Sequence, residues 1–251
     1  MEPHQAVRRS LSLFLLWFLA NSIIFAVLLA MIGITILYAV LIAIFLSTTT
    51  TVLAYRRMEL RIIAKVNAEA IDKGSYPKFE NLVEGLCVAH GFRNPNLFII
   101  SDSAPNMMMV GKNSPQGNLI VTTGLLERVN RVELEGLITH ELSRIRNRLA
   151  LLDCTTAVLV AKPFVLLPGF VKWLTAKLFA SWSVAETDLQ AVSLTRYPTA
   201  LASALSSLNI DGRVPRANPK FCRHLWINPP ANALIESGFS TRDRVAALSE
   251  L

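Results

Sequence analysis

The sequence predicts an α+β protein that begins with a transmembrane helical hairpin. Three observations lead to this prediction: a long uncharged apolar run near the N-terminus, two short β-rich runs between turn-forming residues, and amphipathic helical patterns around them. Hydrophobic residues make up 52% of the chain and charged residues only 17%. An ordinary soluble domain is less apolar than this, so the composition favours a membrane protein.

The apolar run contains no charged residue between Leu11 and Tyr55. A helix rises about 1.5 Å per residue, so the run is long enough to cross a hydrocarbon core of about 30 Å twice. It is also far longer than the apolar part of a cleaved signal peptide. We therefore expect residues 1–57 to form two transmembrane helices, with the turn at residues 31–35 around Gly33.

Basic residues flank both ends of this hairpin, with Arg8 and Arg9 before it and Arg56 and Arg57 after it. Cytoplasmic loops carry an excess of Lys and Arg, so both ends are expected in the cytoplasm and the protein in the inner or plasma membrane. The domain that follows, residues 58–251, is then cytoplasmic. The 25 Lys and Arg residues are scattered, which argues for contact with a lipid bilayer and against a nucleic-acid partner.

A second apolar region, residues 149–182, is interrupted by Asp153, Lys162, Pro163, Pro168 and Lys172. Charges at bilayer depth cost several kcal/mol and proline breaks the backbone hydrogen bonds of a helix, so one clean span is excluded. Two alternatives remain open: a re-entrant or membrane-associated helical hairpin, and a strongly distorted pair of spans.

In the rest of the domain, residues 97–101 and 119–123 are β-rich runs bounded by turn residues. Apolar residues recur at helical spacing from Leu60 to Ile71, a helix is expected from Glu133 onward, and residues 198–208 form a weaker helical pattern. Residues 209–218 have the composition of a loop. The sheet is therefore expected to be small and the domain mostly helical.

The most informative segment is Thr139-His140-Glu141-Leu142-Ser143-Arg144. In a zincin helix, two histidines at positions i and i+4 bind Zn²⁺ on one face, and the glutamate after the first histidine activates the metal-bound water. Here His140 and Glu141 are present, but Arg144 stands where the second histidine is required.

Segments outside this motif extend the pattern over the whole chain. They are 104–111 (APNMMMVG), 121–127 (VTTGLLE), 133–136 (ELEG), 224–229 (HLWINP) and 239–241 (FST). Together they resemble the HtpX-type family of membrane zinc metallopeptidases. The resemblance implies a zincin-like metallopeptidase domain over residues 58–251, whose strand with Asn106, Met107, Met108 and Met109 would pair with an extended substrate.

The departures from the family pattern concern the metal. Members supply a third ligand from a glutamate four residues before an aspartate, and here Val184 holds the ligand position while Asp188 is retained as a residue supporting the metal ligands. Glu186 lies two residues along the helix from Val184, about 200° away, and should face elsewhere. His140 is then the only retained ligand and Glu141 a vestigial general base, so no zinc is expected.

Two functions remain open. The first is a proteolytically inactive binding or regulatory protein, with membrane proteins or an active protease as partners. The second is an active zinc metalloendopeptidase in membrane-protein quality control with an atypical metal site. If the metal has been lost, Arg144 is expected to pair with Glu141 and Asp188 in its place. The strand at Met107–Val110 is expected either to offer a free edge to a partner or to be covered by the protein itself, for instance by residues 209–218.

Overall fold

The computed structural model describes residues 3–112, 116–179, 184–235 and 239–251. The α-helices are α1 (Pro3–Met31), α2 (Ile36–Arg56), α3 (Met58–Lys65), α4 (Pro77–His90), α5 (Thr123–Arg128), α6 (Arg131–Arg146), α7 (Leu149–Thr156), α8 (Pro168–Phe179), α9 (Val184–Thr195), α10 (Pro198–Asp211) and α11 (Thr241–Ser249). A π-helical turn, η1 (Ala157–Ala161), continues α7, and a 3₁₀-helix, η2 (Lys220–Leu225), lies between α10 and α11. The strands are β1 (Glu69–Ala70), β2 (Asn96–Ile100), β3 (Met107–Val110) and β4 (Asn118–Thr122).

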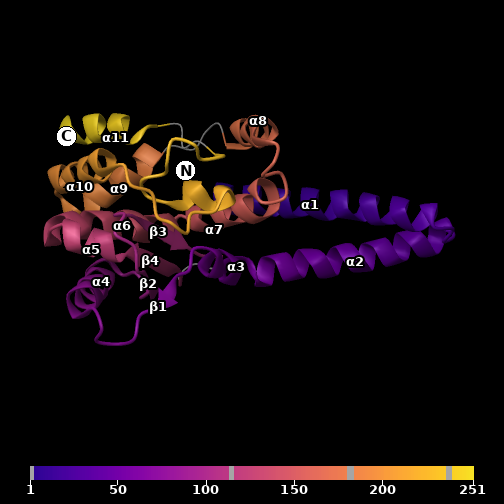
Figure 1. The fold of residues 1–251 in the computed structure, drawn as a ribbon, viewed down its shortest axis with the longest axis horizontal. Helices are drawn as coiled ribbons and strands as arrows, with labels where there is room; N and C mark the ends of the chain where they lie inside the picture. Colours follow the sequence, from indigo (N-terminus) through magenta and orange to yellow (C-terminus); the bar gives the residue numbers. More distant parts are fainter. Residues whose placement is uncertain (1–2, 113–115, 180–183, 236–238) are drawn as a thin grey trace.

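Helices α1 and α2 form the expected hairpin and project side by side from the rest of the protein (Figure 1). They turn at residues 32–35, where Gly33 has a φ of 87° that a side chain would disfavour. Both helices are long and apolar enough to cross a membrane, and large side chains such as Ile23 and Phe45 are exposed along them. Exposed apolar surface on this scale requires a lipid or protein partner.

The base of the hairpin packs on the folded domain. Ala6, Ser10 and Leu13 of α1 are buried, and α1 lies against α7. The rings of Phe14 and Tyr55 meet edge to face with centroids 5.6 Å apart, which joins the two helices where they leave the domain.

The second apolar region begins as part of the core. Every residue of α7 and η1 is buried, and with 8 and 5 residues the two are together too short to span a bilayer, which takes about 20 residues. A turn leads to α8, and Leu166, Phe170 and Trp173 of the turn and α8 are exposed. The re-entrant or membrane-associated hairpin expected over residues 149–182 stays a proposal, and its residues 180–182 lie outside the described residues.

The sheet has the order β1-β2-β4-β3, in which β2 and β4 are parallel and the two outer strands are antiparallel to their neighbours. Strands β2 and β4 match the predicted runs to within one residue. The expected helix from Leu60 to Ile71 is too long, because α3 ends at Lys65 and Asn67 turns the chain with a φ of 53° into β1. Helix α10 continues to Asp211, so the expected loop begins only after that residue.

Side chains of β3 alternate between two cores, as the period of a strand requires. Met107 and Met109 belong to a cluster with residues of α4, α6 and α10. Met108 and Val110 belong to a second cluster with residues of α1, α3, α7 and η2. One face of β3 therefore packs under the motif helix α6, and the other packs on the elements next to the hairpin.

Candidate functional site

Helix α6 carries the motif residues and is fixed in place by its own start signal and by its neighbours. Asn130 accepts hydrogen bonds from the N–H groups of Val132 and Glu133 at 3.0 Å, and Glu133 accepts one from the Asn130 N–H, which completes a capping box. From Gly136 to Ile145 every residue is buried. The charged residues of this stretch must therefore find partners inside the protein.

His140 belongs to a chain of buried contacts that runs from α6 through α9 to α11. Its Nδ1 lies 2.8 Å from Asp188 Oδ1. Asp188 also accepts two hydrogen bonds from Arg244, each at 2.8 Å, and Arg244 donates a further one to the Ile227 carbonyl at 2.7 Å. Burial by itself raises the pKa of Asp188, but the Arg244 guanidinium and His140 hold it well below its usual value.

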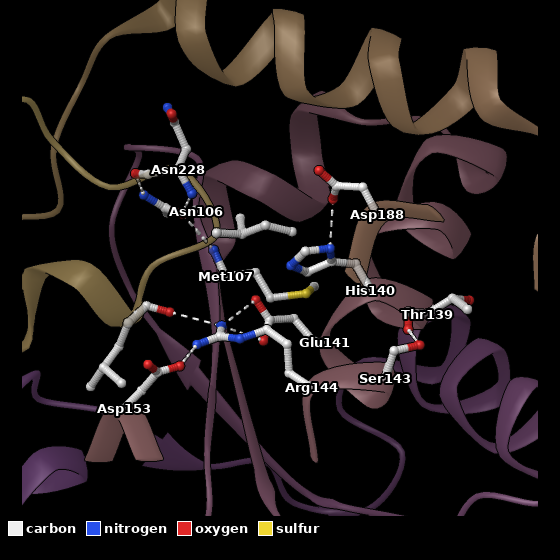
Figure 2. A network of polar contacts seen from close by, with 12 residues as sticks. Asn106, Met107, Thr139, His140, Glu141, Ser143, Arg144, Asp153, Asp188 and Asn228 are labelled. Carbon is white, nitrogen blue, oxygen red and sulfur yellow. Dashed lines mark hydrogen bonds and ion pairs between the residues drawn. The ribbon is translucent and has the colours of Figure 1, made fainter. Parts of the chain in front are cut away.

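Arg144 forms a second cluster with Glu141 and Asp153 (Figure 2). Its Nη1 donates to both Glu141 carboxylate oxygens, at 2.9 and 3.1 Å, and its Nη2 donates to Asp153 Oδ2 at 2.6 Å. Nη1 also reaches the Leu225 carbonyl at 3.1 Å. Burial lowers the pKa of Arg144, but the two carboxylates outweigh it and raise the pKa above its usual value.

The expected pairing of Arg144 is thus half confirmed. Glu141 is its partner, as the i, i+3 spacing predicts, but the expectation that Asp188 would be the other is wrong. Asp188 pairs instead with His140 and Arg244. The second carboxylate that pairs with Arg144 is Asp153 of α7. The sequence contains a signal for the pairing of Asp153, because a single carboxylate within an apolar run needs a buried cation as its partner. Burial raises the pKa of Asp153 to about 6, against the opposing pull of Arg144.

A cavity of about 30 Å³, room for about two water molecules, lies beside the motif. Its lining includes His140, Arg144 and Val184, the residues that the resemblance leads us to expect at the three ligand positions, together with Arg244. Glu186 is exposed, as expected from its rotation along α9.

His224 also lines this cavity, although its sequence position gave no relation to a metal site. Its Nε2 is 3.2 Å from the Asp153 carbonyl oxygen. Burial lowers the pKa of His224 to about 4, and the Arg144 cation adds to this effect, so the ring is neutral at physiological pH.

Among the residues that the structure describes, the lining of the cavity contains two imidazoles, two guanidinium groups and no carboxylate. Within the described residues, no group of three or more His, Cys, Asp or Glu side chains is placed to hold a metal ion. A zinc site needs at least three protein ligands, usually uncharged or anionic, and a fixed guanidinium repels the ion. The donor set does not fit zinc.

The outer edge of β3 is covered by the protein itself. The Thr122 N–H donates to the Asn106 carbonyl at 3.1 Å, so the backbone groups of Asn106, Met108 and Val110 face β4 and those of Met107 and Met109 face outward. The Met107 carbonyl accepts a hydrogen bond of 2.8 Å from the Ile227 N–H, and Met108 is bridged to Trp226.

The covering segment, residues 225–228, is called the strap below. Coverage of this edge by the protein itself is one of the two expected alternatives, with residues 209–218 as the example; of these, Asn218 accepts a 3.0 Å hydrogen bond from Trp226 Nε1 of the strap. In the sequence, residues 225–228 are visible only as part of the segment 224–229 that resembles the family.

A membrane hairpin followed by a His-Glu helix beside a small sheet defines the class of membrane-anchored metallopeptidase folds. The chain belongs to peptidase family M48, whose model matches residues 76–251. It is 32% identical to a protease HtpX homolog of Dictyoglomus turgidum, over 91% of this chain and 84% of that protein. A homolog of Dictyoglomus thermophilum is 30% identical over 84% of this chain and 81% of its own length. These findings confirm the HtpX-type family.

The buried cluster predicts a large effect of removing its cation. Arg144→Ala leaves Glu141 and Asp153 buried without a counter-charge and should lower the free energy of unfolding by about 3 kcal/mol. The control is Arg213→Ala, which removes an exposed arginine from its pair with Asp211 and should leave stability within measurement error. Urea unfolding in detergent micelles measures both, and equal effects would show that the cluster does not stabilise the fold.

The depressed pKa of Asp188 predicts a loss of stability in acid. Because its folded-state pKa lies below the unfolded value of about 3.9, its contribution to stability is present above about pH 4 and is lost progressively as the pH falls from there toward the folded-state pKa. Asp188→Asn should therefore show a shallower fall in unfolding free energy between about pH 5 and pH 2 than the unmodified chain. Glu186→Gln removes an exposed carboxylate from the same helix and serves as the control. An unchanged slope in Asp188→Asn would contradict the assignment.

Proposed function

We propose that this chain is a membrane-anchored HtpX-type member of family M48 that does not cleave peptides and acts by binding. The observation that carries the proposal is the position of Arg144, whose guanidinium lies at the second ligand position and is ion-paired with Glu141 and Asp153. In an active zincin that glutamate activates a metal-bound water. Here both of its oxygens accept hydrogen bonds from Arg144.

The remaining features support a binding or regulatory role. The folded domain keeps a well-packed sheet, the motif helix and the contact between His140 and Asp188, which is the arrangement that orients a ligand histidine in a metal site. The hairpin exposes apolar surface suited to the bilayer or to other membrane segments. The relatives are named as proteases, so the partners proposed here are membrane polypeptides or an active membrane protease.

One observation favours the second candidate, an active peptidase with an atypical metal site. His224 is neutral and lines the same small cavity as His140, so two imidazoles are close to the vacated position. Against it stand the two buried arginines, which do not deprotonate at any physiological pH. Zinc content separates the two functions directly.

Purified without added zinc, the chain is expected to contain well under one equivalent of zinc and to leave casein intact. Arg144→His with Val184→Glu restores the two ligand types, but it also leaves Asp153 without its cation. We therefore expect stoichiometric zinc only when Asp153→Asn is added, and little zinc in any single variant. Elemental analysis after dialysis against a zinc buffer gives the measurement.

Glu141→Gln in that triple variant is the matched control, because it should keep the zinc and lose any recovered cleavage. Stoichiometric zinc in the unmodified chain, lost in His140→Ala, would overturn the proposed function and support the atypical peptidase.

The proposed orientation places residues after α2 in the cytoplasm and the hairpin turn on the opposite side. The chain's own cysteines, Cys87, Cys154 and Cys222, are buried, so a new surface cysteine can be labelled selectively. In intact cells a membrane-impermeant maleimide is expected to label Met31→Cys beside the turn and to leave Lys73→Cys unlabelled until the membrane is opened. Labelling of Lys73→Cys in intact cells would reverse the topology.

A further inference from the structure

The strap adds to the β3 edge in the way that an extended peptide adds to an exposed sheet edge. Of the backbone groups on β3, those of Met107 and Met109 face outward, and the Met107 carbonyl is already bonded to the Ile227 N–H. The Asn106 side chain binds both backbone groups of Asn228, the residue that follows Ile227 in the strap. Its Nδ2 donates to the Asn228 carbonyl at 2.9 Å, and its Oδ1 accepts from the Asn228 N–H at 3.3 Å. Main-chain pairing of this kind is the basis of strand addition.

The other side of the strap is held by two arginines. Arg144 donates to the Leu225 carbonyl at 3.1 Å and Arg244 donates to the Ile227 carbonyl at 2.7 Å. Both guanidinium groups are themselves fixed, Arg144 by Glu141 and Asp153 and Arg244 by two hydrogen bonds to Asp188. The strap carbonyls therefore meet rigid, charged donors, which make stronger hydrogen bonds than neutral ones.

We infer that Arg144 and Arg244 clamp the strap on the β3 edge as a built-in occupant, so that the edge is closed to any other extended polypeptide. Arg144, the arginine at the second ligand position, thus does more than compensate the charge of the buried carboxylates. It also binds the chain segment that fills the peptide-binding edge. A partner that adds to β3 must first displace residues 225–228 from both arginines. The clamp does not depend on whether the protein cleaves peptides, because none of its contacts involves a metal.

The alternation of β3 provides a residue-resolved test. Met108 packs in the cluster that contains Trp226 of the strap, and Met107 and Met109 pack in the opposite cluster, which contains Ile227 of the strap. All three are fully buried, and Met31 at the end of α1, beside the hairpin turn, is exposed. If the strap lifts, hydrogen peroxide should reach the methionines of β3, while Met58 of α3, which is also buried, stays protected.

The experiment compares the full chain in detergent with Arg144→Lys and Arg244→Lys, which keep a buried cation but lose the planar set of donors. Oxidation of each methionine by dilute peroxide is followed by mass spectrometry, and backbone hydrogen exchange is followed for peptides covering the strap and the sheet. Each variant should raise the oxidation rate of Met108 and the exchange rate of the strap by about tenfold or more. Strand β4 should not change.

Arg213→Lys, at an exposed arginine, is the matched control and should behave as the unmodified chain. Asn106→Ala removes two hydrogen bonds to the strap without changing a charge and serves if an arginine variant does not fold. It should expose Met108 and leave Met58 protected in the same way. The inference is overturned if the strap of the unmodified chain exchanges as fast as an open loop. It is also overturned if the variants expose Met58 of α3 as fast as Met108, which would report general loosening rather than release of the strap.

Discussion

The buried guanidinium of Arg144 is the constraint on which the centre of this protein depends. A permanent cation inside a protein costs several kcal/mol unless carboxylates and hydrogen-bond acceptors surround it. Arg144 obtains Glu141 from its own helix, Asp153 from α7 and the Leu225 carbonyl from the strap. Three parts of the chain must therefore converge on one side chain. The sharp turn at Arg148, with a φ of 61°, returns α7 toward α6 and makes this convergence geometrically feasible.

The charges of the site are balanced by separating them into two clusters. Asp188 neutralises Arg244 and orients His140, while Arg144 is shared by two carboxylates that repel each other. Burial raises the pKa of Asp153 to about 6, and the neighbouring Glu141 carboxylate adds to this effect against the pull of Arg144. Burial of charge on this scale is poor evidence for stability as such, and its better-attested role is to specify one arrangement of the packed elements.

The sequence predicted what depends on local pattern and missed what depends on distant contacts. The hairpin, β2, β4 and α6 follow from composition, periodicity and a known motif. Strand β1 has two residues and no periodicity to recognise. Asp153 was visible as an isolated carboxylate, but its pairing with Arg144 requires the α6–α7 turn. The positions of His224 and the strap are set by the return of the chain after α10, for which the local sequence contains no signal.

The β3 edge is also tied to the base of the hairpin, which limits how any partner can approach it. At the end of β3, the Lys112 N–H donates to Glu59 Oε1 at 2.8 Å, and its Nζ bonds the Arg56 carbonyl at 3.0 Å. The Lys112 Nζ also lies 5.7 Å from the centre of the Tyr55 ring. One end of the strand is thus fixed where α2 leaves the apolar hairpin, and the strap contacts begin at the other end. In the proposed topology, an extended polypeptide that replaces the strap would lie with one end close to the membrane surface. This geometry suits a segment that emerges from the bilayer better than one that arrives from bulk solvent, and it is the physical reason to seek the partner among membrane proteins.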